Sequence, residues 1–324
     1  DGMTISFHHH FRGGDKVVNM VVGKLAEMGF KNLHLAASSL SDVHAPLIDH
    51  IKNGVITKIS TSGLRGELAK EISHGLMKEP VVFRSHGGRG SAIAKGDLHI
   101  DVAFLGASSS DPAGNASGYS RSEHAKSICG SLGYAKPDAQ YADKVVIITD
   151  DLVDYPNTPN SISEHDVDYV VLVDSVGDSS KISSGAIRDT KNPRDILLAM
   201  NAAKVIVNSG YFKEGFSIQT GSGGASLAAV KYIREEMIKR GIHSSFALGG
   251  ITAHMVKMHE EGLIERLIDV QSFDRVAAES IKNDPFHKGV SANEYASADE
   301  PGSAVHYLDI VILSALEVDV NFNV

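Results

Sequence analysis

Short apolar runs alternate with stretches of helical periodicity along the whole chain. Runs rich in β-branched residues predict strands at Asn32–Ala36, Val55–Ile59, Val81–Arg84, Val102–Gly106, Val145–Thr149, Val167–Val173, Phe216–Thr220, Ser244–Leu248, Leu267–Val270 and Ile310–Leu313. Apolar residues at helical spacing predict helices at Asp15–Met28 and Ala225–Arg240. This alternation is typical of an α/β fold with mostly parallel sheets flanked by helices.

The two halves of the chain resemble each other at a domain-sized offset. Ile100–Ala107 (IDVAFLGA) matches Leu308–Ala315 (LDIVILSA), 208 positions further on. The same offset aligns two Asp-x-x-x-Asn loops, Asp111–Asn115 and Asp319–Asn323. A matched strand followed by a matched loop predicts a duplication, and a repeat of this length means two similar domains rather than a solenoid.

A polar stretch separates the two halves. Residues Gly177–Pro193 are rich in Ser, Asp and Gly and precede a new helical pattern. We therefore expect a first domain at residues 1–190 and a second at 191–324. The sequence begins at Asp1 rather than Met and stops at Val324 near a strand-like run. We expect a fragment of a longer polypeptide, with the second domain truncated at its C-terminal end.

Composition and charge narrow the function classes. The 324 residues are 42% hydrophobic and 22% charged, as in a globular protein that buries two cores. The net charge is −9 and the chain has no Lys/Arg run, which argues against nucleic-acid binding. With a single cysteine, Cys129, and no signal-peptide or membrane-spanning pattern, we expect a cytoplasmic protein with no intrachain disulfide and no membrane contact.

One strand-end loop is rich in glycine. Ligands of parallel α/β folds bind at the carboxyl ends of the strands, and Gln219–Gly224 (QTGSGG) lies between a predicted strand and a predicted helix. Its glycines, Gly221, Gly223 and Gly224, allow backbone N–H groups to approach a phosphate, a carboxylate or a thioester oxyanion closely. The alternative is a simple tight turn. The loop matches neither a Walker motif nor the full Rossmann glycine spacing.

Three consecutive histidines, His8–His10, follow the first predicted strand. Adjacent residues on a strand point to opposite faces, so the three cannot all face one ion, and no further ligand spacing accompanies them. We therefore predict no metal site. We expect His9 and His10 to contact a substrate carboxylate beside Arg12.

Arginines recur in the strand-end loops of the first half. Arg12, Arg65, Arg84 and Arg89 all occupy such positions. Because the guanidinium group matches a carboxylate with two parallel hydrogen bonds, such a set suits a polyanionic acid. We predict substrate contacts for Arg12, Arg65 and Arg89. The alternative for each is a surface ion pair.

The paired loops of the repeat carry further candidates. Ser109 and Ser110 lie in the first loop, and we predict that they contact substrate. Asp111 has the position of a residue that caps a turn. Glu317 in the second loop is a candidate base, orienting group, nucleophile or structural carboxylate.

The sequence resembles the alpha subunit of citrate lyase, within the wider superfamily of CoA-transferases. The segments that carry the resemblance are Ile5–Arg12 (ISFHHHFR), Ser85–Arg89 (SHGGR), Asp101–Asp111 (DVAFLGASSSD), Asn208–Ser217 (NSGYFKEGFS), Phe246–Thr252 (FALGGIT) and Ile312–Asp319 (ILSALEVD). The resemblance spans the chain and implies two CoA-transferase-like domains. It also implies an activity, in which acetyl carrier protein and citrate give citryl carrier protein and acetate.

The resemblance implies partners as well. The carrier's thiol belongs to a CoA-like prosthetic group on a separate small subunit, for which CoA or acetyl-CoA can substitute, and this chain itself holds no permanent cofactor. The citrate lyase beta and gamma subunits are the implied protein partners, and we expect an oligomer.

One departure from related CoA-transferases bears on mechanism. Relatives that form a glutamyl thioester carry Glu in a His-Ser/Thr-Glu segment, where this chain has Ser245 in Gly241–Phe246 (GIHSSF). Without a carboxylate there, an acyl–enzyme anhydride cannot form at that position. The resemblance then implies direct attack of citrate on the acetyl thioester in a ternary complex, with catalysis by positioning and oxyanion stabilisation. A CoA-transferase or acyl-CoA hydrolase for another acid, and a non-catalytic subunit that docks a carrier, remain the alternatives.

Overall fold

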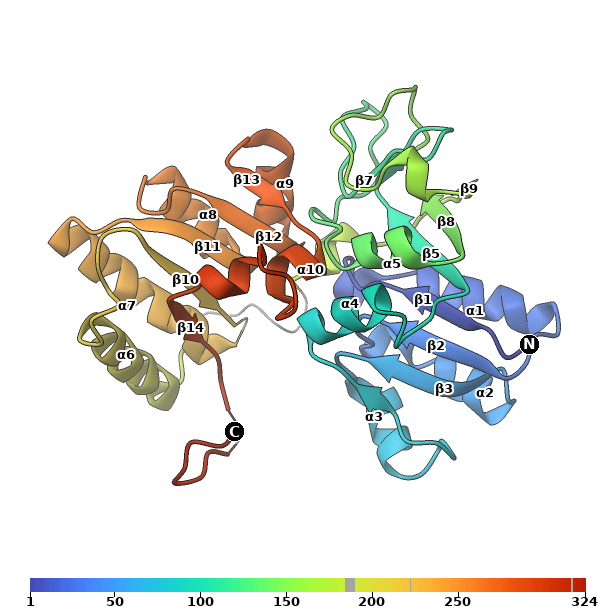
Figure 1. Ribbon diagram of the computed structural model, residues 1–324, viewed down its shortest axis with the longest axis horizontal. Coiled ribbons are helices and arrows are strands. Elements are labelled where there is room, and N and C mark those ends of the chain that lie inside the picture. The colour runs from blue at the N-terminus through green and yellow to red at the C-terminus, as the bar shows by residue number, and fades with distance from the viewer. Residues whose placement is uncertain (184–189, 222, 316) are drawn as a thin grey trace.

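The computed structural model describes residues 1–183, 190–221, 223–315 and 317–324, and Figure 1 shows two β-sheets side by side, each flanked by helices. The first sheet is parallel throughout and has the strand order β4-β3-β2-β1-β5-β8-β9. Its strands are β1 (Thr4–Phe7), β2 (Leu33–Ala37), β3 (Ile56–Thr61), β4 (Val82–Phe83), β5 (Val102–Ala107), β8 (Lys144–Thr149) and β9 (Tyr169–Leu172). A short antiparallel hairpin, β6 (Ser109–Ser110) with β7 (Ala116–Ser117), follows β5.

Helices and 3-10 turns connect these strands. They are η1 (Arg12–Gly14), α1 (Val17–Glu27), η2 (Asp42–His44), α2 (Leu47–Lys52), α3 (Gly66–Ser73), α4 (His86–Ala94), α5 (Ala135–Tyr141), η3 (Glu164–Asp166) and η4 (Ser179–Lys181). The apolar side chains of β1, β2, β3 and β5 and those of α1 and α2 form one buried cluster. The predicted strands and the first helix are therefore confirmed, with ends that differ by a few residues.

The second sheet repeats the order of the first. It is parallel and runs β13-β12-β11-β10-β14, so β10 corresponds to β1 and β14 corresponds to β5. The predicted equivalence of Val102–Gly106 and Ile310–Leu313 is confirmed. The elements are α6 (Pro193–Val207), β10 (Phe216–Thr220), α7 (Gly224–Arg240), β11 (Ser244–Ile251), α8 (Ala253–Glu260), β12 (Leu267–Ser272), α9 (Arg275–Asn283), β13 (His287–Gly289), α10 (Ala292–Ala296), η5 (Ala304–Tyr307) and β14 (Ile310–Ile312).

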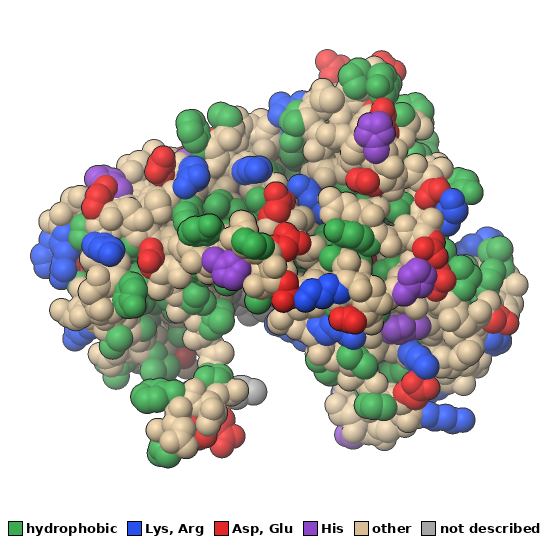
Figure 2. Space-filling view, viewed as in Figure 1, with side chains coloured by type: hydrophobic (Ala, Val, Ile, Leu, Met, Phe, Trp, Pro, Cys, Tyr) green, Lys and Arg blue, Asp and Glu red, His purple; other side chains and the backbone are tan. Residues whose placement is uncertain are grey.

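The aligned Asp-x-x-x-Asn loops have the same local structure. Asp111 Oδ1 accepts hydrogen bonds from the Gly114 and Asn115 N–H groups, and its Oδ2 accepts one from Asn115 Nδ2. Asp319 Oδ1 likewise accepts from the N–H groups of residues 321 and 323, and its Oδ2 accepts from Asn323 Nδ2. The carboxylates thus close turns, as expected for Asp111. Asp111 and Asn115 are buried, whereas the second loop lies in the exposed segment that projects from the second sheet (Figure 1), and Figure 2 shows apolar side chains on that segment.

The two sheets are joined by a packed interface rather than by the connecting segment alone. Helices α4 and α5 contact α10, and Tyr134, which precedes α5, is buried in one cluster with Phe246, Val270 and Tyr295 of the second half. A Cβ on Gly133 would overlap the carbonyl oxygens of residues 270 and 290. The backbone contact at Gly133 therefore requires glycine.

The boundary predicted between residues 190 and 191 directly follows residues 184–189, which lie outside the described ranges. The last strand of the first sheet along the chain, β9, ends at Leu172, and α6 begins at Pro193. The predicted boundary lies between these two elements and stays a prediction. None of the described helices is long and apolar enough to cross a lipid bilayer.

Candidate functional site

A cavity of about 580 Å³ lies between the two sheets, at the carboxyl ends of their strands. From the first half it is lined by loops that follow β1, β2 and β3 and by the start of α4; these contribute His9, Arg12, Ser41, Asp42, Arg65 and His86. From the second half it is lined by the ends of β10, β11 and β12, which contribute Gln219, Thr220, Gly221, Gly250 and Gln271, together with Phe273 and Tyr295. Carboxyl ends of parallel strands are where α/β folds bind ligands.

Two arginines give the cavity its charge. The guanidinium carbon of Arg12 lies 4.5 Å from the ring centroid of Phe273, across the interface. Burial and the nearby Arg65 lower the pKa of Arg12 to about 10, so the group stays charged at neutral pH. Among the described residues, no carboxylate forms an ion pair with Arg12 or Arg65. Two unpaired guanidinium groups beside one cavity make an anion site with room for more than one carboxylate.

Aromatic and imidazole rings form the adjoining wall. The rings of His9 and Tyr134 stack with centroids 5.3 Å apart, and the His86 ring lies 4.8 Å from that of Tyr134. The pKa of His9 lies well below its usual value, because burial disfavours the charged ring and His86 and Arg12 repel it. Burial, followed by repulsion from Arg89 and Arg65, lowers the pKa of His86 to about 4. The imidazoles at this wall are therefore neutral near pH 7.

The second half supplies uncharged hydrogen-bonding groups. Tyr295 Oη accepts a hydrogen bond from Gln219 Nε2 at 2.6 Å, which leaves the phenol proton free for another acceptor. The Thr220 hydroxyl is buried at the end of β10 and has no partner in the part of the chain that the structure describes. Gln271 Nε2 donates across the interface to the His9 carbonyl oxygen at 2.8 Å. This bond fixes the strand-end loop of His9 against β12.

The structure brings four of the predicted site residues to this cavity. His9, Arg12, Arg65 and Gly221 line it. Gly223 is the N-cap of α7 and Gly224 is the first residue of this helix, while Ser222, between Gly221 and Gly223, lies outside the described residues. The glycine-rich loop thus directs the amino end of a 17-residue helix toward the site.

Arg89 and His10 are buried behind the wall rather than exposed in the cavity. Both guanidinium NH2 groups of Arg89 donate to Asp138, each at 2.7 Å, and one also donates to the Ala36 carbonyl oxygen. Its charge is therefore compensated inside the protein and not available to substrate. His10 is fully buried and packs against His8 and Tyr134. The predicted substrate contacts of both residues have no support in this geometry.

Four other candidates lie away from the cavity. Ser109 and Ser110 are fully buried, and their hydroxyls donate to the carbonyl oxygens of residues 119 and 111. Ser245 lies at the amino end of β11 in a different depression, which Glu214 and His243 line. Gly250, at the other end of β11, is five residues away, roughly 16 Å along a strand. Glu317 is exposed in the segment beyond β14. None of these four residues lines the cavity.

Residues that sequence reasoning missed complete the wall. His86 and Gln219 stood inside motifs that the sequence singled out, so their strand-end position could have identified them. Tyr134, Gln271 and Tyr295 had no such signal, because they reach the cavity only through the packing of one half against the other.

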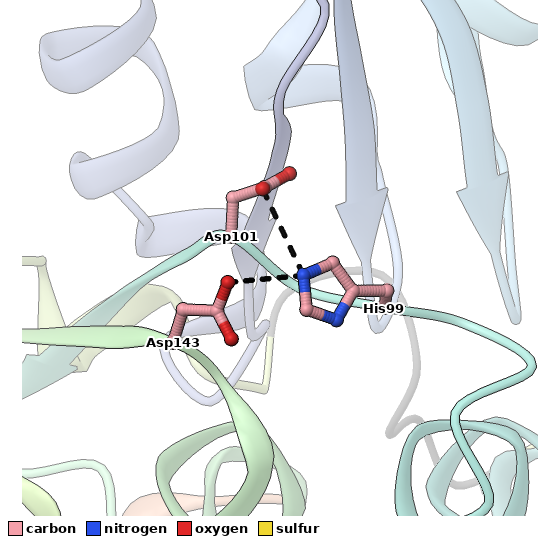
Figure 3. Close-up of side chains that lie close together, drawn as sticks. All are labelled: His99, Asp101 and Asp143. Atoms are coloured by element: carbon pink, nitrogen blue, oxygen red, sulfur yellow. Dashed lines mark hydrogen bonds and ion pairs between the residues drawn. The ribbon is translucent and has the colours of Figure 1, made fainter.

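A separate group of titratable side chains lies at the amino ends of strands of the first sheet, opposite the ends that face the cavity. His99 Nε2 is 3.1 Å from Asp143 Oδ2 and 3.8 Å from Asp101 Oδ1 (Figure 3). Asp101 Oδ2 also accepts the Thr4 N–H. Both carboxylates approach one imidazole nitrogen, so the group is a surface cluster of polar side chains that ties the starts of β1, β5 and β8 together. The prediction of no metal remains a prediction.

Solved structures define the class to which this fold belongs. The malonate decarboxylase alpha subunit from Acinetobacter baumannii has a TM-score of 0.65 at 18% identity, covering 90% of this chain and 52% of that one. The 4-hydroxybutyrate CoA-transferase from Porphyromonas gingivalis has a TM-score of 0.56 at 13% identity, covering 90% and 64%. At these identities the likeness shows the fold alone, and the fold is that of the CoA-transferases.

Closer relatives define the family. A sequence model of the family described as citrate lyase, alpha subunit (CitF), matches residues 1–324, and the chain belongs to this family. The citrate lyase alpha chains of Haemophilus influenzae and Escherichia coli are 60% and 59% identical over all of this chain. The chain spans 64% and 63% of their lengths. A structure described as the alpha subunit of citrate lyase from Streptococcus mutans, in complex with citrate, has a TM-score of 0.95 at 59% identity, covering 100% of this chain and 63% of that one.

Proposed function

We propose that this chain transfers an acyl carrier thiol from acetate to citrate, so that acetyl carrier protein and citrate give citryl carrier protein and acetate. The observation that carries the proposal is the interdomain cavity, where two unpaired arginines, Arg12 and Arg65, face the glycine-rich end of β10. A tricarboxylate needs compensation by several cationic or N–H donors, and this cavity offers them. The citrate complex of the Streptococcus mutans relative supports this choice of acid.

The reaction balances without a covalent enzyme intermediate. A citrate carboxylate oxygen attacks the acetyl carbonyl carbon; the C–O bond forms and the C–S bond breaks, giving a mixed anhydride and a thiolate. The thiolate then attacks the citryl carbonyl carbon, the C–S bond of the product forms, and acetate leaves with the anhydride oxygen. Each step develops an oxyanion, which the backbone N–H groups at the amino end of α7 can stabilise; the Gly221 N–H itself donates to the Ile312 carbonyl oxygen.

The positions of the candidate nucleophiles support this direct route. Ser245 lies at the far end of β11, and Glu317 lies outside the cavity. Among the described residues that line the cavity, Asp42 is the carboxylate. A covalent transferase that forms an anhydride on an enzyme carboxylate, the alternative reading, would therefore have to use Asp42 among these residues.

The remaining partners belong to the same proposal. The thioester would enter on the CoA-like arm of a separate carrier protein, and the citrate lyase beta and gamma subunits would complete an oligomeric, cytoplasmic assembly. The citrate lyase name of the relatives supports the assembly. An exchange at a carrier thioester also explains a cavity open to an arm from outside the chain.

Initial-rate kinetics with acetyl-CoA and citrate test the proposal on the chain itself. We expect citryl-CoA and acetate in equal amounts and intersecting reciprocal plots, because both substrates must bind before a product leaves. Ping-pong kinetics, together with hydroxylamine trapping of an acyl group on Asp42, would favour the covalent alternative. No citrate-dependent turnover in the folded chain would favour a subunit that only docks the carrier.

A further inference from the structure

His9 and Ser38 form a pair at the ends of two neighbouring strands. Strands β1 and β2 pair in register, with Phe7 opposite Ala37, so the residues that follow them lie side by side. The Ser38 hydroxyl oxygen lies 3.0 Å from the His9 backbone nitrogen and 2.6 Å from His9 Nδ1. Ser38 is fully buried, whereas His9 lines the cavity.

These two short distances decide which ring nitrogen carries the proton. The Ser38 oxygen accepts the His9 backbone N–H, and its own proton needs an acceptor. Among the described residues, His9 Nδ1 is the one acceptor within reach. If Nδ1 carried the proton instead, the buried Ser38 hydroxyl would keep an unused donor, which is unfavourable inside a protein. The hydrogen bonds are therefore satisfied when Nδ1 accepts and Nε2 carries the proton.

The opposite nitrogen is the one available to a ligand. His9 Nε2 has no hydrogen-bond partner in the described part of the chain. Stacking on Tyr134 at an interplanar angle of 18°, with the His86 ring 6.1 Å away, limits rotation of the imidazole. The Gln271 bond to the His9 carbonyl oxygen fixes the backbone beneath it.

We propose that His9 is a neutral, preoriented hydrogen-bond donor to an oxygen of the bound acid, and that Ser38 is a positioning residue that fixes its tautomer. The role of the donor rests on the proposed function, whereas the tautomer does not. Arg12 and Arg65 supply the positive charge, and His9 supplies direction without taking a proton. The attacking carboxylate consequently stays ionised.

Nitrogen NMR of the ¹⁵N-histidine-labelled chain tests the tautomer without any substrate. We expect the His9 spectrum at pH 7 to show a protonated Nε2 and an unprotonated Nδ1, with its signals assigned by their loss in His9→Gln. In Ser38→Ala we expect a mixture of both tautomers. A protonated Nδ1 in the unchanged chain, or an unaltered tautomer in Ser38→Ala, would overturn the role of Ser38.

Two isosteres test the donor. A glutamine amide nitrogen can occupy the place of Nε2, whereas an asparagine amide nitrogen reaches only the place of Nδ1. We expect His9→Asn to weaken citrate binding about tenfold in calorimetry, which is one lost hydrogen bond to a charged acceptor. His9→Gln should retain a larger share of the affinity.

The outcomes separate the inference from the proposed function. Equal losses in His9→Gln and His9→Asn, in chains with unchanged thermal unfolding, would overturn the donor assignment. If the unchanged chain bound no citrate, the proposed function would fail together with the donor assignment, and the tautomer spectrum would still decide the role of Ser38. The pH dependence of citrate affinity, compared between the unchanged chain and His9→Gln, adds a further check. Citrate loses its own last proton near this range in both chains, whereas a neutral donor adds no further step between pH 6 and 8. The titratable and charged groups that face His9 are His8, His10, Arg12, His44, His86 and Tyr134. If the affinity followed a His9 titration in that range, the neutral-donor role would be wrong.

Discussion

At the scale of single residues, the site depends on charges that the protein leaves unpaired. Arg12 and Arg65 repel each other and line a cavity. Arg89 is buried and forms two hydrogen bonds with the carboxylate of Asp138. The first arrangement is stable in the presence of an anion, and the second needs none. This difference separates binding residues from structural ones more clearly than their common position in strand-end loops.

Removing either cavity arginine should weaken citrate use selectively. Arg12→Ala and Arg65→Ala each remove a charge-assisted hydrogen bond, worth about 1.5–3 kcal/mol, so we expect the citrate KM to rise about 10- to 100-fold. The KM for acetyl-CoA should change much less. Initial rates with each substrate varied in turn measure both constants.

Arg234→Ala is the matched control, because it removes an arginine whose partner is Glu261 on the surface, with N–O distances of 2.6 and 2.7 Å. Surface ion pairs contribute little, so both KM values should stay unchanged. Equal increases in the two KM values of Arg12→Ala would count against a citrate-binding role.

Arg89→Met should act on stability rather than on substrate affinity. The change leaves Asp138 buried without its partner, and the cost of such an isolated charge is about 3–5 kcal/mol. Urea unfolding measures it. The double variant Arg89→Met with Asp138→Leu should recover most of the loss, because a buried pair can be replaced by apolar side chains of similar volume. No recovery in the double variant would mean that Arg89 has another role.

The sequence located part of this site because strand-end loops meet at one edge of a parallel sheet. By that rule His9, Arg12, Arg65 and Gly221 were expected at one edge, and all four line the cavity; their contacts with substrate stay predictions. The rule could not tell which way a side chain points, so Arg89 was assigned to substrate although its helix turns it toward α5. Tyr134 and Tyr295 depend on interdomain packing, for which a single sequence carries no local pattern.

At the scale of elements, the glycine-rich loop shows why one strand–helix unit suits a ligand. Gly223 has an extended backbone, with φ −70° and ψ 151°, and a Cβ there would lie 3.5 Å from the Ser314 hydroxyl, an ordinary contact. The protein itself thus tolerates a side chain at this position. The need for glycine would come from the approaching thioester.

Gly223→Val should therefore fold normally and turn over poorly. We expect a fall in kcat of about 100-fold, because the side chain keeps the thioester away from the backbone N–H donors. The unfolding temperature should fall by only a few degrees, since the Cβ makes an ordinary contact and the N-cap preference for Gly over Val is worth about 1 kcal/mol. Gly23→Ala serves as the control, because Gly23 lies in α1 with open space around its Cα. Near-normal turnover in a folded Gly223→Val chain would contradict the proposed position of the thioester.

Element positions were largely predictable, and the physical reason is the repeat. Two copies of one pattern gave independent indications of the same strands, so the match of β5 with β14 followed from sequence alone. Short elements such as the β6–β7 hairpin, and the five-residue α10, carry too few apolar positions for a periodicity to be read.

At the scale of the whole molecule, the site exists only while the two halves stay docked. The cavity takes one wall from each half, and glycines allow the close contacts between α4, α5 and α10. Function should consequently be sensitive to interface changes far from any substrate.

Gly133→Ala should loosen the interface. Its Cβ would overlap two carbonyl oxygens of the second half, and such overpacking costs about 1–3 kcal/mol. We expect a lower unfolding temperature, a larger radius in small-angle scattering and a raised citrate KM. Gly23→Ala is again the control, and it should be neutral or slightly stabilising. If Gly133→Ala left scattering and KM unchanged, the interface would not be needed to form the site.

The buried imidazoles make the stability of the whole chain depend on pH in a definite direction. Burial is the largest cause that lowers the pKa of His8 to about 4, and the pKa of His86 is also about 4. In the unfolded chain both titrate near 6.5, so between about pH 6.5 and 4 the unfolded state binds more protons than the folded state. The free energy of unfolding must then fall as pH decreases through this window, by up to about 3 kcal/mol for each group.

Urea unfolding at pH 7, 6 and 5 measures this loss, and His86→Gln provides the matched test. The variant removes one titrating group, so about one proton fewer is taken up on unfolding at pH 5. Its free energy of unfolding should therefore decrease less steeply with falling pH than that of the unchanged chain. If the three pH values gave the same unfolding free energy, the imidazoles would take up protons in the folded state, and the neutral wall of the cavity would be wrong.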